Sequence, residues 1–121
     1  MRPFGELEAV IMDRVWSRTQ PVTVREVRED LLRERQLAYT TVMSVMDNLH
    51  RKGVLSRERD GRAYRYWAVR TREGHSAQLM REALDASGDR AAALVRFFEQ
   101  MDPKEVIQLR AALDAARRKG S

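Results

Sequence analysis

The sequence predicts a mainly α-helical fold with one small β-hairpin, and three observations lead to this prediction. Apolar residues recur at helical spacing over most of the chain. Residues 64–69 instead alternate between two faces, and the pair Asp60-Gly61 before them is typical of a tight hairpin turn. The length of 121 residues suits one ordinary domain, or a small domain with an appendage. Three short helices followed by such a hairpin predict a winged helix-turn-helix.

The first two helices are predicted from apolar stripes and one capping signal. The first runs from about Glu6 to Arg18, and its apolar positions are Leu7, Val10, Ile11, Met12, Val15 and Trp16. The second opens after Thr23, because Thr23 and Glu26 have the spacing of a capping box. It ends near Arg35, and its apolar face consists of Val24, Val27, Leu31 and Leu32.

The third helix starts near Tyr39 or Thr40, after a short connection. Its apolar face has the i, i+3, i+4, i+7 spacing and consists of Val42, Val45, Met46 and Leu49. Gly53 lies where a residue in the left-handed conformation often ends a helix. We therefore expect this helix to stop at Gly53 and the hairpin to follow at once.

The hairpin covers residues 54–69. We expect Asp60-Gly61 to form a type I′ turn, because both residue types tolerate the positive φ that this turn requires. One face of the second strand can then pack on the helices while the other stays in solvent. On this basis Tyr64 and Tyr66 are interpreted as core packing rather than as ligand contacts.

The last part of the chain is predicted to be helical. The expected helices run from Thr71 to about Ala86, from Asp89 to Gln100, and onward from Pro103. They hold too few large apolar side chains to close a core alone, so we expect a second copy of the chain to cover them in a two-fold homodimer. The alternative is that they fold back on the hairpin and its helices. The expected dimer contacts are Leu94, Phe97, Phe98, Val106, Leu109 and Leu113.

The net charge of +5 is concentrated in one segment. Residues 1–49 carry 7 basic and 8 acidic side chains, residues 50–72 carry 8 and 2, and residues 73–121 carry 8 of each. The positive excess therefore lies at the end of the third helix and in the hairpin. Such a patch suits a polyanion, although a basic face that only contacts solvent has the same composition.

The third helix offers candidate contacts to double-stranded DNA. Thr40, Thr41, Met43, Ser44 and Asp47 lie off its apolar stripe and can face solvent or a groove. Hydroxyl groups can bind bases or phosphates, and the carbon atoms of threonine or methionine can pack on thymine methyl groups. The alternatives are that Thr40 is only the N-cap and that Thr41 only fills the helix junction.

Basic residues supply the candidate contacts to the DNA backbone. Arg51 and Lys52 can bind phosphates, although both could simply complement the helix dipole. Arg62, at the hairpin tip, is the best candidate for the minor groove or its flanking phosphates. The predicted DNA contacts are Tyr39, Thr40, Thr41, Met43, Ser44, Arg51, Lys52, Arg62 and Arg65. The predicted DNA contacts and the predicted dimer contacts lie in different parts of the chain. We therefore expect two domains, a DNA-binding winged-helix domain at residues 1–70 and a helical dimerisation domain at residues 71–121.

Several protein classes are excluded. The absence of cysteine rules out disulfides and thiolate metal sites and suggests an intracellular, cytoplasmic protein. The N-terminus lacks the apolar part of a secretion signal, and the longest apolar run, residues 91–95, cannot span a bilayer. His50 and His75 have no metal-ligand spacing, and His75 is expected to be exposed on its helix. We therefore expect no enzyme, no catalytic residue, no metal, no cofactor and no membrane partner.

Several segments together resemble the BlaI/MecI family, the bacterial penicillinase repressors. These segments are Tyr39-Thr40-Thr41-Val42-Met43, Leu49-His50-Arg51-Lys52-Gly53 and Asp60-Gly61-Arg62-Ala63-Tyr64-Arg65-Tyr66. The first helix also resembles that of the family, through Leu7-Glu8-Ala9-Val10-Ile11-Met12 and Val15-Trp16. The resemblance implies a homodimeric winged-helix repressor of palindromic operators near β-lactamase or penicillin-binding-protein genes, with a helical C-terminal dimerisation region.

The resemblance also implies inactivation by proteolysis. In this family a sensor-linked metalloprotease cuts the C-terminal region, commonly at an Asn-Phe bond. The equivalent candidate bond here is Arg96-Phe97, with arginine in place of the asparagine. A second departure is Asn48, where relatives often carry an arginine. The missing arginine charge would weaken a phosphate contact or change which DNA sequence is preferred.

Two functions from different classes follow. The expected one is a dimeric, sequence-specific transcriptional repressor that controls β-lactam-response genes. The alternative is a winged helix that acts as a protein-interaction module and binds an acidic protein through its basic patch. The salt dependence of binding to duplex DNA distinguishes them.

Overall fold

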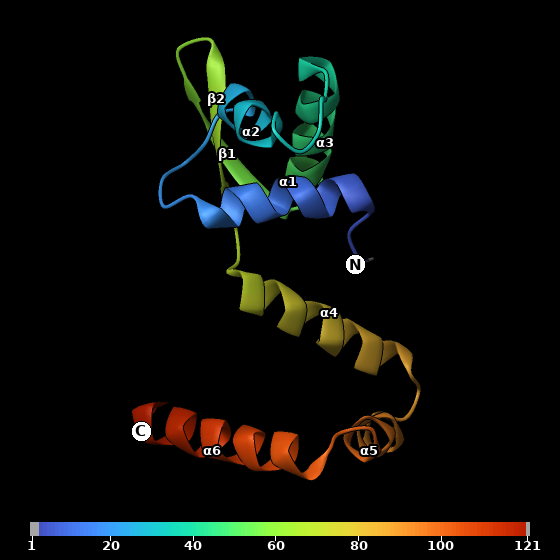
Figure 1. The fold of residues 1–121 in the computed structure, drawn as a ribbon. Coiled ribbons are helices and arrows are strands. Elements are labelled where there is room, and N and C mark those ends of the chain that lie inside the picture. Colours follow the sequence, from blue (N-terminus) through green and yellow to red (C-terminus); the bar gives the residue numbers. More distant parts are fainter. Residues whose placement is uncertain (1–2, 121) are drawn as a thin grey trace. The chain divides into compact units, whose positions relative to one another are not determined.

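The computed structural model describes residues 3–120, and this part of the chain contains six helices and one two-stranded antiparallel hairpin (Figure 1). In chain order they are α1 (Glu6–Ser17), α2 (Val24–Leu31), α3 (Tyr39–Arg51), β1 (Leu55–Asp60), β2 (Ala63–Ala68), α4 (Arg72–Ala86), α5 (Arg90–Glu99) and α6 (Pro103–Gly120). Every predicted element is present, although α2 ends sooner than expected. The chain forms two compact units, Met1–Leu79 and Met80–Ser121, and the boundary between them lies inside α4.

Four of the described helices, α2, α4, α5 and α6, begin where the sequence places capping residues. At α2 the Thr23 hydroxyl accepts a hydrogen bond from the Glu26 N–H at 3.2 Å, and the Glu26 carboxylate accepts one from the Thr23 N–H at 3.0 Å. This reciprocal pair is the predicted capping box. Thr71, Asp89 and Asp102 each accept a hydrogen bond from the N–H three residues on, at 3.0 to 3.1 Å. Their side chains satisfy N–H groups that a helix start leaves without partners.

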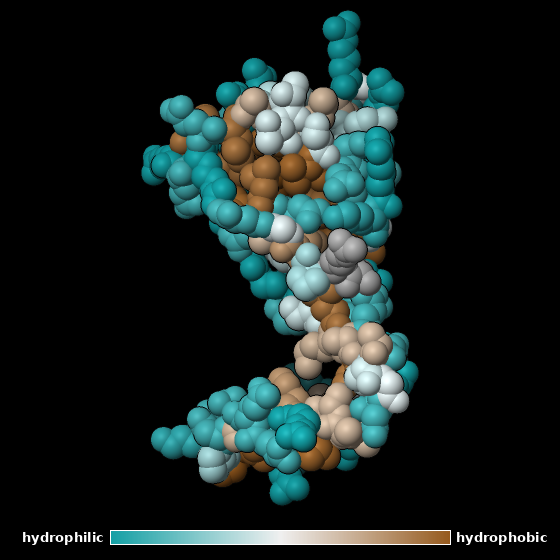
Figure 2. Space-filling model, turned by 90° about the vertical axis from the view of Figure 1, so that its right-hand side faces the viewer, coloured by the Kyte–Doolittle hydropathy of each residue, from teal (hydrophilic) through white to brown (hydrophobic). Residues whose placement is uncertain are grey.

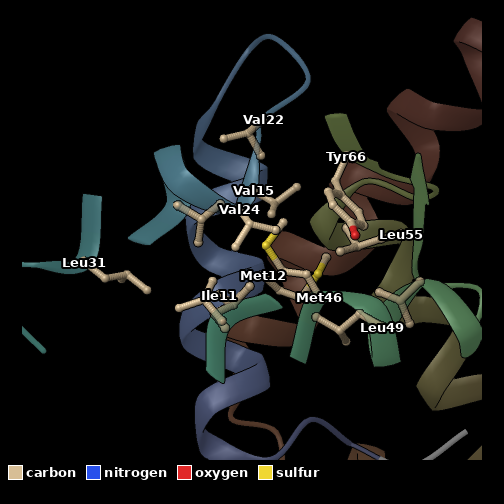
Figure 3. Packing of buried hydrophobic residues seen from close by; sticks show 13 residues of the cluster. Ile11, Met12, Val15, Val22, Val24, Leu31, Met46, Leu49, Leu55 and Tyr66 are labelled. Carbon is tan, nitrogen blue, oxygen red and sulfur yellow. The ribbon is translucent and has the colours of Figure 1, made fainter. Parts of the chain in front are cut away.

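The first unit closes an apolar core between α1, α2, α3 and the hairpin. Figure 3 shows side chains from these elements directed toward one another, with Met12 and Met46 near the centre. Each fully buried aliphatic side chain contributes about 1.5–3 kcal/mol relative to an exposed one. This core therefore fixes α3 relative to the hairpin. Its members are Ile11, Met12, Val15, Val22, Val24, Val27, Leu31, Val42, Met46, Leu49, Val54, Leu55 and Tyr66.

The hairpin turn differs from the predicted one by a single residue. Asp60 pairs with Ala63, so the two loop residues are Gly61 and Arg62 rather than Asp60 and Gly61. Gly61 has φ 65°, and among the described residues only glycines have positive φ. A type I′ turn requires positive φ at both loop residues, so that prediction is wrong. Glycine at the first loop position alone is the requirement of a type II′ turn, and this register places Arg62 at the tip.

The second strand also pairs with the connection between α1 and α2. Val22 and Tyr66 exchange two backbone hydrogen bonds, of 2.9 and 2.8 Å. Tyr66 is 2% exposed, which confirms its interpretation as core. Tyr64, in contrast, is partly exposed and contacts Tyr66 edge to face with ring centroids 6.3 Å apart. The core interpretation of Tyr64 is therefore wrong, because the strand extends past the edge of the core at that residue.

The start of α4 is held against α1, and this contradicts one prediction. His75 is buried rather than exposed, and its ring stacks on Phe4 with centroids 4.3 Å apart. Trp16 lies 5.8 Å from the His75 ring and donates its indole N–H to the carbonyl of Arg70 at 2.9 Å. Two aromatic side chains from the other end of the unit cover His75, and its position in α4 gave no sign of them.

The second unit lacks a comparable core. No described residue of α5 or α6 is buried. Figure 2 shows apolar surface, in brown, among the hydrophilic side chains of this unit. In the described part of the chain, no helix combines the length and the apolar character needed to cross a membrane.

Candidate nucleic-acid interface

The outward face of α3 carries the predicted base contacts. Val42, Met46 and Leu49 are buried, and they hold one side of α3 on the core. The opposite face is exposed and consists of Tyr39, Thr40, Thr41, Met43 and Ser44. The N-cap of α3 is Ala38, so the alternative that Thr40 is only an N-cap is wrong. Hydroxyl, aromatic and thioether groups therefore project together from the first turns of this helix.

The structure brings part of this face next to the hairpin. Met43 and Ser44 of α3 line an open hollow of about 280 Å³ together with residues of β1 and β2. A second hollow, of about 720 Å³, lies between Tyr39 and Arg62 at the hairpin tip. Tyr64 lines both, so the helix and hairpin candidates share one continuous face.

Residues of α2 also border this face, and the sequence did not single them out. Arg25, Arg28 and Leu32 line the second hollow. Arg28 donates to the carbonyl of Leu37 at 2.8 Å, and so ties the α2–α3 connection to α2. Arg25 is exposed and pairs only weakly with Glu29, at 3.8 Å. Their relevance depends on how α2 packs beside the hairpin tip, which no local pattern reveals.

The predicted phosphate contacts differ in how freely they can act. Arg62 is exposed at the turn, and within residues 3–120 it takes part in no ion pair. Lys52 already binds Glu8 of α1 at 2.8 Å, which lowers the pKa of Glu8. Arg65 binds Asp60 at 2.6 Å and lies 3.6 Å from Glu26. Arg62 is therefore the most available cation among these three.

One acidic residue of α3 binds two arginines. Asp47 forms an ion pair with Arg51 at 2.9 Å, and it accepts a hydrogen bond from Arg57 at 3.0 Å. Arg57 also donates to the Tyr66 hydroxyl at 3.2 Å, and its guanidinium carbon lies 4.1 Å from the centroid of the Tyr64 ring. The hydrogen bond to Tyr66, followed by that to Asp47, raises the pKa of Arg57. Like any arginine, Arg57 is permanently charged. Arg57 therefore links the hairpin to α3.

The candidate dimer contacts lie on α5 and α6. All of them are exposed except Leu109, which is half-buried. The rings of Phe97 and Phe98 lie edge to face, 5.8 Å apart. Val95 and Ile107 are also exposed on these helices, although the predicted set left them out. The candidate cleavage bond, Arg96-Phe97, lies inside α5, so a protease could reach it in extended form only after local unfolding.

Among the residues that the structure describes, no candidate metal centre competes with this interface. In this part of the chain, no three or more histidine, aspartate or glutamate side chains are grouped to hold a metal ion. His50 and His75 lie in different helices, α3 and α4.

Comparison with known proteins identifies the family. The model of the penicillinase repressor family matches residues 4–115. The chain belongs to the penicillinase repressor family. The transcriptional regulator BlaI of two Mycobacterium tuberculosis strains is 48% identical over 112 residues, which are 90% of this chain and 81% of each relative. The predicted family is confirmed. The family and these relatives are transcriptional regulators, which confirms that this member of the penicillinase repressor family is not an enzyme.

A solved structure shows the same fold at low identity. A MepR mutant from a multidrug-resistant Staphylococcus aureus clinical isolate aligns with a TM-score of 0.50 and 17% identity, over 96% of this chain and 78% of that chain. Identity this low indicates a shared fold and nothing further. The predicted fold class, helices with a small hairpin wing, is confirmed by the elements themselves.

Proposed function

We propose that this penicillinase repressor family member is a dimeric, sequence-specific transcriptional repressor that binds palindromic operator DNA through two winged helices. The observation that supports this most strongly is the continuous face formed by α3 and the hairpin, with Arg62 exposed at its tip. Membership of a repressor family supports the assignment of DNA binding to that face.

In this proposal α3 is the recognition helix. Its width suits the major groove, where Thr41 and Met43 would contact base edges and thymine methyl groups. Tyr39, Thr40 and Ser44 would add hydroxyl contacts to bases or phosphates. The hairpin would follow the backbone beside the groove.

The cations of this face would bind the DNA backbone. Arg62 would enter the minor groove or bind the phosphates beside it, and this role is favoured because Arg62 forms no ion pair with any residue between 3 and 120. Arg51 is exposed and could exchange Asp47 for a phosphate. Lys52 and Arg65 would act in the same way, but each must first give up a carboxylate partner.

The C-terminal helices would supply the dimer. Residues 1–70 bind DNA and residues 71–121 dimerise in this division of labour. The exposed apolar side chains of α5 and α6 support it, because a second copy would remove them from water. Two joined half-site contacts act at a high effective concentration, which raises affinity without any new contact to DNA.

Regulation would follow from the same division. A sensor-linked protease that cut Arg96-Phe97 would split α5 and leave the winged helix intact. Repression of β-lactam-response genes would then end because the dimer is lost. The family description, which names a penicillinase, supports this assignment of the regulated genes, and a cytoplasmic location fits an operator-binding protein.

The test is selection of duplex DNA from a random pool, followed by footprinting of the bound site. We expect a two-fold symmetric site with half-sites about one or two helical turns apart, at about 34–36 Å per turn. A single asymmetric half-site bound by one chain would contradict the dimer. If no duplex is selected and binding to DNA shows no salt dependence, the alternative of an acidic protein partner would be favoured.

A further inference from the structure

Asp47 joins the recognition helix to the hairpin through two arginines. Its Oδ2 atom forms an ion pair with Arg51, one turn further along α3, and its Oδ1 atom accepts a hydrogen bond from Arg57 of β1. Arg57 is also fixed by the Tyr66 hydroxyl and the Tyr64 ring. One carboxylate therefore binds a guanidinium group from each of the two elements that would contact DNA.

The two arginines differ in freedom. The side chain of Arg57 is 22% exposed, whereas that of Arg51 is 76% exposed and can turn toward a ligand. A phosphate binds a guanidinium group with the same geometry as a carboxylate does. Asp47 and a DNA phosphate would therefore compete for the same N–H donors.

The carboxylate also lies among the predicted base contacts. Asp47 lines the same hollow as Met43 and Ser44. Its negative charge opposes any DNA that approaches this face, whatever the sequence. That uniform repulsion alone does not change specificity, so the difference between sites must come from the restrained arginines. On a matched site, base contacts fix the register of the complex, and a freed Arg51 gains only a phosphate already within its reach. On an unmatched site the chain binds through phosphates alone and can shift to use every free cation, so the restraint of Arg51 weakens this binding more.

We propose that Asp47 is a specificity-determining residue, which restrains Arg51 and Arg57 and weakens binding to arbitrary DNA more than binding to the operator. The inference rests on the proposed DNA-binding function. It assigns to Asp47 an indirect role, through the arginines and the local field, rather than a contact to a base.

The direct test is Asp47→Asn, which keeps the shape of the side chain and removes its charge. The matched control is Glu58→Gln on β1, which removes the same formal charge from an exposed residue that has no ion pair within residues 3–120. Both variants and the wild type are titrated across a range of salt. The probes are a duplex of scrambled sequence and the duplex that the wild type selects from a random pool.

For Asp47→Asn, affinity for the scrambled duplex should rise by up to about tenfold near 0.1 M salt. The log–log salt slope should steepen by about one unit, the effect of one added phosphate contact. Affinity for the selected duplex should rise less, so the ratio of the affinity for the selected duplex to that for the scrambled duplex should fall. In Glu58→Gln that ratio should stay as in the wild type.

Two results would overturn the inference. One is an affinity of Asp47→Asn for the scrambled duplex that is unchanged or lower. The other is an equal fall, in Glu58→Gln, of the affinity for the selected duplex relative to that for the scrambled duplex. A wild-type chain that selects no duplex would instead overturn the proposed function.

A second variant tests the restraint even if Asp47→Asn does not fold. Arg51→Gln should leave the salt slope on the scrambled duplex unchanged, because Asp47 already occupies Arg51 there. A flattened slope on that duplex would show that Arg51 reaches phosphates despite Asp47, and would contradict the proposal.

Discussion

At the residue scale, the positive charge of this protein is less available than its sequence suggests. Lys52, Arg57 and Arg65 each have a carboxylate partner, from α1, α3 and the hairpin in turn. Arg62 has none in the described chain and lies at the tip of the turn. Exposed ion pairs contribute little to stability, so we interpret these pairs mainly as determinants of which cation can meet a phosphate.

Arg62→Ala should therefore show the clearest electrostatic effect. Affinity for DNA should fall on every sequence, and the log–log salt slope should flatten by about one unit for one lost phosphate contact. Lys52→Ala is the control variant. Lys52 must first leave Glu8 before it can bind a phosphate, so the salt slope of DNA binding should change less in this variant. Titration of one duplex at several salt concentrations measures both. An unchanged slope and affinity in Arg62→Ala would leave the hairpin without an electrostatic role.

Thr41→Ala and Met43→Ala should act differently, because their expected contacts are to bases. Each should cost about 1–3 kcal/mol on the selected duplex and little on a scrambled one. Circular dichroism should show an intact fold, because both side chains are exposed. Equal losses on the two duplexes would mean that these residues do not read sequence.

At the element scale, each helix and strand could be predicted because its signals are local. Caps at Thr23, Asp89 and Asp102 and the stripes of α1 to α3 lie within a few residues of what they specify. Some errors were local, since the hairpin turn is displaced by one residue and α2 ends at Leu31. Others occurred where distant segments meet. His75 is buried by Phe4 and Trp16, which lie 71 and 59 residues earlier in the chain. Similarly, the partners of Lys52 and Arg57 come from other elements, so no spacing rule could find them.

The α2 capping box gives stability a dependence on pH. The Thr23 N–H, followed by its hydroxyl, Arg18 and Arg65, lowers the pKa of the Glu26 carboxyl. The folded state then binds fewer protons than the unfolded state near the ordinary glutamate value of about 4.3. This contribution to the free energy of unfolding is present above that pH and is lost as pH falls through the lower folded value.

Urea unfolding at a series of pH values measures this effect. Glu26→Gln keeps an acceptor for the Thr23 N–H but cannot titrate, so its free energy of unfolding should vary less between about pH 5 and pH 3. A variant with the same pH dependence as the wild type would show that Glu26 does not contribute.

At the scale of the whole molecule, the chain combines a unit with a closed core and a unit without one. The first unit extends to Leu79, past the residue-70 boundary expected for the DNA-binding part, because the start of α4 packs on α1. The second unit exposes Phe97, Phe98 and Ile107. The small number of large apolar side chains in the C-terminal helices predicted that they need a partner. Which surface covers them depends on contacts with another molecule, and no local sequence pattern specifies such contacts.

A chain that ends after residue 79 should therefore retain the winged helix and lose the dimer. It keeps the buried core and the His75 cluster, whereas a cut at residue 72 would expose Phe4 and Trp16. The fragment should bind the selected duplex much more weakly, because two free monomers must each meet the entropy cost of association. Some preference for the selected over the scrambled duplex should remain, since α3 is unchanged.

Analytical ultracentrifugation of the full chain and of residues 1–79, with parallel titration of the selected duplex, tests whether the C-terminal helices form the dimer that gives the protein its DNA affinity. We expect a full-length dimer that binds one symmetric duplex tightly, and a monomeric fragment that binds it weakly with the same sequence preference. A fragment that stays dimeric and binds like the full chain would place dimerisation in the first unit. That result would contradict the division of labour and remove the physical basis for induction by cleavage in α5.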